Sequence, residues 1–175
     1  MSISRTTLDK IRERAEFACE YCEVSETDSG GKLTVDHFQP TSKNGGDEES
    51  NLVYCCFRCN IYKSDYWHNE PNQIRLFNPR TDKRDEHFWL SESGKLYALT
   101  ETGEFTVKLL RLNRQPLISK RQNDYQKLEE RQILGQAQKA VESLIRLSRQ
   151  QRELLKQQQM LLEEQRRLIE FLFRQ

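Results

Sequence analysis

Four of the five cysteines stand in two identically spaced pairs, Cys19 with Cys22 and Cys56 with Cys59. A Cys-x-x-Cys pair places two thiolates on one tight turn, and two such turns together supply the four ligands of a closed tetrahedral zinc site. The alternative of buried thiols or disulfides is disfavoured by the paired spacing and by an N-terminus that does not resemble a secretion signal. We therefore expect a structural zinc ion that contributes to folding. Cys55, next to Cys56, is either a substitute zinc ligand or, as we expect, a small core residue.

The segment between the cysteine pairs also carries polar residues that could do chemistry. It contains two short apolar runs, near residues 33–38 and 52–54, which predict two strands joined by a glycine-containing loop, and a short helix is expected after the second pair. Taken singly, the polar residues could be a turn acid, a core histidine and helix or turn caps. Taken together, they lie at the corners of a strand, loop, strand and helix; they are Asp36, His37, Asn51, Asn60 and Lys63.

This pattern resembles the HNH endonucleases, whose ββα-metal motif runs C-x-x-C, then D-H or H-H, then N-L, then C-x-x-C-[HN] with a nearby Lys. The chain has Asn60 at the last position, where His or Asn occurs. A later string (FNPR, HF, SGKLYALT, TGEFTVKLLRLN and Arg121) resembles the extension that follows this core in stand-alone bacterial HNH proteins, so the resemblance covers about residues 5–122. About ten positions of the motif agree: Cys19, Cys22, Asp36, His37, Asn51, Leu52, Cys56, Cys59, Asn60 and Lys63.

The resemblance implies metal-dependent hydrolysis of DNA phosphodiester bonds. It makes His37 the general base, Asn51 the residue that fixes the loop orienting His37, and Asp36 and Asn60 the ligands of a catalytic divalent ion. The residue types suit these roles, because a neutral imidazole accepts a proton near its ordinary pKa of about 6.5 and oxygen ligands prefer Mg²⁺ or Mn²⁺. Lys63 and Arg58 are expected to contact nucleic-acid phosphates.

Two other functions fit the same residues. The first is a non-catalytic, zinc-folded nucleic-acid-binding adaptor that assembles a complex through its C-terminal helices. The second is an HNH nuclease that cleaves RNA. By analogy with stand-alone bacterial HNH proteins, the nuclease interpretation extends to a role as effector of a defence system.

The elements around this core are predicted from periodicity and turn residues. A helix is expected over 7–18 with Thr7 as its N-cap, and Ile74–Arg80 is expected to be extended. A hairpin is expected from the runs at 87–90 and 95–99, which flank a Ser-Glu-Ser-Gly turn, followed by a helix over 105–112. The predicted fold is therefore α+β, with an HNH core, structural zinc and a hairpin and helix extension. We expect residues 1–115 to form this nuclease domain.

From residue 116 onward the composition changes, and Gln, Arg, Glu, Lys and Leu dominate. Leucines recur every seven residues on a face about three positions wide, which predicts a long helix or helical hairpin with coiled-coil character rather than Gln-rich disorder. Gly135 is a candidate break within it. Residues 116–175 are expected to bind a second subunit or a partner protein. The heptad leucines are Leu147, Leu154, Leu161 and Leu168.

The charge is unevenly distributed along the 175 residues. The whole chain has a net charge of +1 and a mean hydropathy of −0.88, which predicts a soluble, cytoplasmic protein with no membrane span. Residues 1–113 carry 15 Lys and Arg against 19 Asp and Glu, whereas 114–175 carry 13 against 8. An acidic nuclease half needs placed cations, its metals, the basic tail or a partner to hold DNA.

Overall fold

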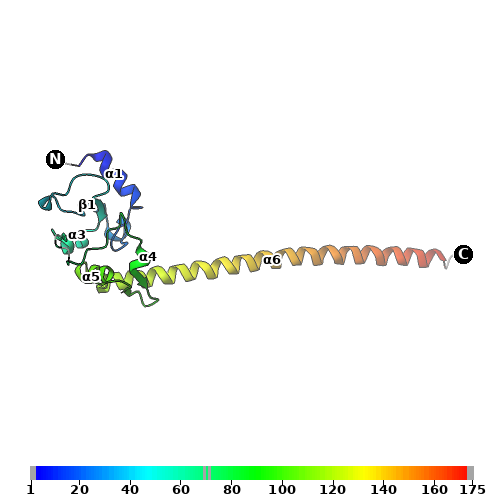
Figure 1. Cartoon of the computed structure of the whole chain (residues 1–175). Coiled ribbons are helices and arrows are strands. Elements are labelled where there is room, and N and C mark those ends of the chain that lie inside the picture. Colours follow the sequence, from blue (N-terminus) through cyan, green and yellow to red (C-terminus); the bar gives the residue numbers. More distant parts are fainter. Residues whose placement is uncertain (1–2, 69, 71, 173–175) are drawn as a thin grey trace. The chain divides into compact units, whose positions relative to one another are not determined.

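The computed structural model describes residues 3–68, 70 and 72–172. It has the expected mixed α+β architecture, with two small antiparallel strand pairs and a long C-terminal helix (Figure 1). The elements in chain order are α1 (Arg5–Arg14), α2 (Glu26–Ser29), β1 (Thr34–His37), η1 (Thr41–Lys43), β2 (Leu52–Cys55), α3 (Phe57–Lys63), α4 (Arg84–His87), β3 (Phe88–Leu90), β4 (Leu96–Ala98), α5 (Glu101–Leu109) and α6 (Gln115–Leu172).

Strand β2 is the centre of the N-terminal half, because it is buried on both of its faces. It pairs antiparallel with β1, so that Asp36 lies opposite Val53 and His37 opposite Leu52. Successive side chains of a strand point to opposite faces. Leu52 and Tyr54 accordingly pack with α1, whereas Val53 and Cys55 belong to the larger core around the four other cysteines.

Helix α1 starts and ends earlier than the sequence suggested. Its N-cap is Ser4, whose Oγ accepts a hydrogen bond from the Thr7 backbone N–H at 3.1 Å, so the prediction of Thr7 as N-cap was wrong. The helix ends at Arg14 rather than near residue 18, because Glu16 and Phe17 have left-handed backbone conformations with φ of 49° and 60°. This tight turn leads the chain directly into the first cysteine pair.

The expected hairpin is present as β3 and β4, and α5 packs against β4. Helix α5 begins at Glu101, four residues before the predicted start, because the Thr100 hydroxyl caps it by accepting from the Gly103 N–H at 3.0 Å. A Cβ at position 103 would lie 2.3 Å from the His87 carbonyl oxygen. Glycine at 103 therefore allows α5 to approach the backbone just before β3.

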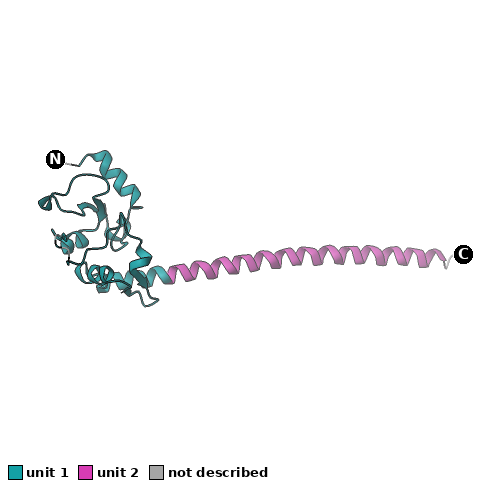
Figure 2. Cartoon of the chain, viewed as in Figure 1, with its two compact units in different colours: residues 1–125 teal, residues 126–175 magenta. Residues whose placement is uncertain are grey.

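Helix α6 continues through Gly135, so the proposed break there is wrong and no helical hairpin forms in residues 115–172. The chain divides into two compact units, residues 1–125 and 126–175 (Figure 2). The first turns of α6 belong to the first unit, where Leu117 and Arg121 are buried. Of the helices in the described residues, none combines the length and apolar character that crossing a bilayer requires.

A polar cluster joins α1, α2 and β2 on the edge of the first unit. The Arg12 guanidinium donates to both carboxylate oxygens of Glu26, at 2.5 and 2.6 Å. The Tyr54 hydroxyl also donates to Glu26 and accepts from the Leu33 backbone N–H at 2.8 Å. The hydrogen bond from Arg12, and then that from Tyr54, lowers the pKa of Glu26 to about 2.

This cluster predicts an acid-sensitive contribution to stability. A carboxyl group whose pKa is lower in the folded chain stabilises it above the unfolded pKa of about 4.5, and this stabilisation fades as the pH falls toward the folded value. We expect Glu26→Gln to lower the melting temperature at pH 7, and the difference from the wild type to shrink between pH 5 and pH 3, measured by circular dichroism. A difference that is constant over this range would contradict the assigned role of the ionised Glu26.

Candidate active site and zinc centre

The four paired cysteines converge at the centre of the first unit. Their sulfur atoms all lie within 4.8 Å of one another, and all four residues are buried. The Sγ atoms of Cys22 and Cys56 are 3.6 Å apart, close to the sulfur spacing of about 3.8 Å that a tetrahedral site with Zn–S bonds near 2.3 Å requires. The four cysteines are therefore positioned to hold a zinc ion, as the sequence predicted.

Each Cys-x-x-Cys turn, or knuckle, also directs a backbone N–H group toward a cysteine sulfur. The Cys22 N–H donates to the Cys19 Sγ and the Cys59 N–H to the Cys56 Sγ, both at 3.5 Å. The second knuckle is the first turn of α3, with Cys56 as the N-cap. Hydrogen bonds from the Cys19, Cys22 and Cys59 thiols lower the pKa of Cys56, so this sulfur favours the thiolate form that binds metal.

Arg114, which the sequence analysis did not single out, lies against this cluster. Its Nη2 is 3.9 Å from the Cys56 Sγ and 4.0 Å from the Cys22 Sγ, and its Nη1 donates to the Leu110 and Arg111 carbonyl oxygens. Burial acts to lower the pKa of Arg114, but the nearby thiolates outweigh burial and the net shift is upward. The residue just before α6 thus supplies a fixed positive charge beside the thiolates.

Asp36 and Lys63 form a buried ion pair between β1 and α3. The Lys63 Nζ lies 2.9 Å from the Asp36 Oδ2 and donates to the His37 carbonyl oxygen at 2.8 Å. The Lys63 side chain is completely buried. From this position its ammonium group cannot meet a phosphate at the surface, so the prediction of a phosphate contact is corrected to a structural role for Lys63 at the end of β1.

His37 lies beside the loop that joins the two strands. Its Nε2 is 2.7 Å from the Oδ1 of Asp47, a residue that sequence reasoning missed. A carboxylate only accepts hydrogen bonds, so Nε2 carries the proton and Nδ1 keeps the free lone pair in the neutral ring. One fifth of the His37 side chain is exposed, which leaves the ring accessible to solvent. The contact fixes both the tautomer and the orientation of the imidazole.

Asn51 closes the base of that loop. Its Oδ1 accepts from the Gln39 N–H at 2.8 Å, and its Nδ2 donates to the Gln39 carbonyl at 3.1 Å and to the Gly46 carbonyl at 2.8 Å. The loop backbone approaches so closely that a Cβ at Gly45 would lie 1.8 Å from the Gln39 oxygen. Asn51 therefore holds the two ends of the loop that presents Asp47 to His37.

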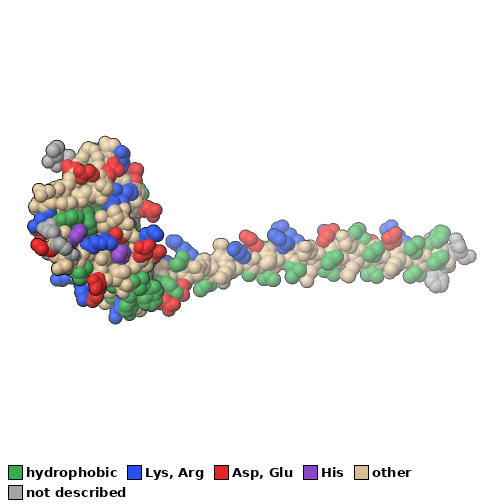
Figure 3. Space-filling model, viewed as in Figure 1, with side chains coloured by type: hydrophobic (Ala, Val, Ile, Leu, Met, Phe, Trp, Pro, Cys, Tyr) green, Lys and Arg blue, Asp and Glu red, His purple; other side chains and the backbone are tan. Residues whose placement is uncertain are grey.

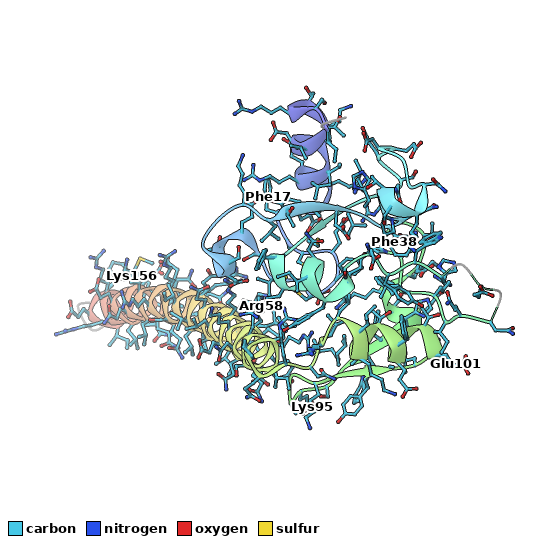
Figure 4. All side chains as sticks on the ribbon, turned by 90° about the vertical axis from the view of Figure 1, so that its left-hand side faces the viewer. Phe17, Phe38, Arg58, Lys95, Glu101 and Lys156 are labelled. Carbon is cyan, nitrogen blue, oxygen red and sulfur yellow. The ribbon has the colours of Figure 1, made fainter. Side chains whose placement is uncertain are left out.

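Asn60 and Arg58 are positioned differently on α3. Asn60 is one helical turn before Lys63, so both residues lie on the same face of the helix. Among the described residues, the Asn60 side chain makes no hydrogen bond, and it is partly exposed. Arg58 is exposed on α3 (Figure 4) and is thus available to a ligand in solution.

Comparison with known proteins matches one segment of this chain to a family. Residues 19–65 match the family model of the HNH endonucleases. This segment is an HNH endonuclease domain. The chain is also 28% identical over 136 aligned positions to the Septu protein PtuA of Bacillus mycoides (strain KBAB4). That match covers 61% of this chain, and it spans only 19% of the length of the relative.

A cleft of about 720 Å³ opens beside the HNH domain, between the loop that Asn51 closes and the extension. Its lining includes Phe38 and Trp67, whose rings meet edge to face at 5.8 Å, and the side chains of His68 and Arg75. His68 lies against Trp67, whereas His87 bonds to the Thr100 hydroxyl at 2.6 Å. Neither histidine belongs to the four-cysteine cluster.

The contact of Arg114 with two sulfurs predicts that it slows zinc loss. Groups that hydrogen-bond to metal ligands typically change metal affinity by about 10- to 100-fold when removed. We expect Arg114→Gln to release zinc about tenfold faster or more to a chromophoric chelator. Arg111→Gln is the matched control, because Arg111 stacks on Tyr62 as Arg114 does but has no contact with the sulfurs among the described residues. Equal release rates for the two variants would contradict the role.

The buried ion pair predicts a stability cost for removing only one partner. Lys63→Met leaves the Asp36 carboxylate without its cation, which should destabilise the HNH domain by about 3 kcal/mol. Urea unfolding of the zinc-loaded protein measures this loss. Adding Asp36→Asn should recover part of it, because the unpaired charge is then gone, whereas the exposed Arg58→Ala should leave stability unchanged. Unaltered unfolding of Lys63→Met would rule out the structural role.

Proposed function

We propose that this chain is a metal-dependent endonuclease that hydrolyses DNA phosphodiester bonds, with His37 as the general base. The observation that carries the proposal is the contact between the His37 Nε2 and Asp47 in a loop closed by Asn51. This contact leaves the Nδ1 lone pair to accept a proton from an attacking water. Asn51 acts through the loop and is a positioning residue.

Asp36 and Asn60 would hold the catalytic divalent ion. Lys63 pairs with the Asp36 Oδ2, which leaves Oδ1 for a metal, and the side-chain Oδ1 of Asn60 accepts no hydrogen bond from another described residue. Both are hard oxygen ligands of the kind that Mg²⁺ and Mn²⁺ prefer. A bound divalent ion would neutralise the charge that develops on the phosphate and on the leaving oxygen. The His37 carbonyl, held by Lys63, keeps the end of β1 fixed while the imidazole accepts its proton.

DNA would bind the domain through a few individually positioned side chains rather than through overall charge, because residues 1–113 carry a net negative charge. Arg58 on α3 offers an exposed cation for a phosphate. The cleft beside the loop offers the partly exposed ring of Trp67, on which an unpaired base could stack. Because contacts to phosphates carry no sequence information, we expect cleavage with little sequence preference.

We further propose that residues 1–115 supply the nuclease and that 116–175 assemble it with a second subunit or a partner protein. The second unit is one exposed helix with a long apolar stripe, which supports an assembly role. The similarity to a Septu protein supports a part in bacterial defence as an effector of such an assembly. The five free thiols suit the reducing cytoplasm.

Cleavage of supercoiled plasmid by the purified, zinc-loaded chain tests the nuclease proposal. We expect nicking that requires added Mg²⁺ or Mn²⁺ and falls about 10²- to 10⁴-fold in His37→Ala. Asp47→Ala should lose less, because the imidazole loses its partner but keeps its lone pair. His87→Gln is the matched control. This histidine lies outside the site, so the variant should cleave like the wild type.

Three results would overturn the proposal. Equal cleavage by His37→Ala and the wild type, with equal zinc content, would exclude His37 as the base. Cleavage of a single-stranded RNA in preference to every DNA substrate would show that the substrate is RNA, with His37 still the general base. A full zinc site without cleavage of either nucleic acid would support the adaptor function instead.

A further inference from the structure

The second unit presents a continuous apolar stripe that no other part of the described chain covers. Heptad leucines 147, 154, 161 and 168 are 52–59% exposed, and Figure 3 shows apolar side chains repeating along this helix. Exposed apolar areas of this extent mark sites of protein association. The stripe consists of three neighbouring heptad series, which include Ile133, Leu134, Val141, Leu144, Leu155, Leu162, Ile169 and Leu172 beside those leucines.

Three glutamines inside the stripe indicate what covers it. Gln151, Gln158 and Gln165 continue the heptad series of Leu144 and Leu172. A primary amide both donates and accepts, so a glutamine is complementary to the same glutamine of an identical helix in register. A purely aliphatic partner would leave three buried amides unpaired, which is costly. The amides therefore favour a second copy of this chain as the occupant.

The charges along the two borders of the stripe distinguish the helix directions. One border carries Glu164 and the other carries Arg152 and Arg166. In a parallel pair opposite borders face each other, so Glu164 lies near Arg166 of the second copy. An antiparallel pair can also match the glutamines. In that pair each border faces the same border of the second copy, so Arg152 lies near Arg166 of the second copy. Like charges at these flanking positions are unfavourable, so the borders favour the parallel arrangement.

We propose that residues 133–172 form a parallel, in-register, two-helix coiled coil with a second copy of this chain. The parallel direction connects both HNH domains to the same end of the coiled coil. Two copies could then act on the two strands of one duplex. This inference deepens the assembly role proposed above, and the pairing itself does not depend on nuclease activity.

The first experiment measures the oligomeric state of the zinc-loaded full chain by light scattering after size exclusion. We expect a dimer, and we expect Leu154→Glu with Leu161→Glu to raise its dissociation constant about a hundredfold or more and to yield monomers. Arg149→Glu with Lys156→Glu introduces the same charges on the opposite face and should stay dimeric. A monomeric wild type, a trimer or tetramer, or a dimer that survives both leucine changes would overturn the proposal.

The second experiment reads the helix direction with engineered cysteines. Gln151→Cys and Gln165→Cys lie about 21 Å apart along one helix, and they lie opposite each other in the antiparallel pair that matches the glutamines. In the parallel, in-register pair each variant alone forms an interchain disulfide under mild oxidation, and the zinc-loaded wild type does not. Cross-linking only in a mixture of the two variants would show an antiparallel pair and overturn the proposal, as would no cross-linking in either. Both experiments omit Mg²⁺ and Mn²⁺, so an inactive nuclease leaves their outcomes unchanged.

Discussion

The convergence of four cysteine sulfurs within 4.8 Å is the constraint on which the first unit depends. These sulfurs join the turn after α1 to the start of α3, and the strands of the HNH domain lie between them in sequence. The extension is bound to the same point, because Arg114 reaches two of the sulfurs from the residue just before α6. A chain with 31% charged residues thus packs its apolar core around the four-cysteine cluster.

The proposed active site is attached to that core through two polar clusters. On the helix side, the buried Lys63 ammonium holds both the Asp36 carboxylate and the His37 carbonyl. On the loop side, Asn51 fixes the backbone that carries Asp47 to His37. Adjacent residues of β1 are thereby oriented by different partners, which suits the proposed roles of Asp36 as a metal ligand and His37 as the general base.

The sequence predicted the parts of the fold that depend on strong local patterns. Cysteine spacing predicted the metal site, and alternating apolar runs predicted β1, β2 and the later hairpin. Helix limits were less accurate, because Ser4 and Thr100 cap through side-chain bonds and the left-handed Phe17 has no distinctive sequence signal. Gly135 was misleading, since one glycine costs only about 1 kcal/mol in a long helix.

Tertiary contacts were beyond prediction from sequence. Lys63 looked like a surface cation because lysines usually are, and only the packing of α3 on β1 shows that its ammonium is buried. Asp47 and Arg114 likewise gain their roles from contacts with residues that are distant in sequence, and nothing in the spacing marks either one. The only signal for Asp47 in the sequence was that it is a charged residue on a loop of the motif.

We expect a zinc ion held by the four thiolates to organise the first unit. X-ray absorption at the zinc edge of the purified protein, with metal content measured on the same sample, tests it most directly. We expect about one zinc per chain, surrounded by four sulfurs at about 2.3 Å. A protein that folds without zinc, or a shell in which nitrogen or oxygen replaces sulfur, would contradict it.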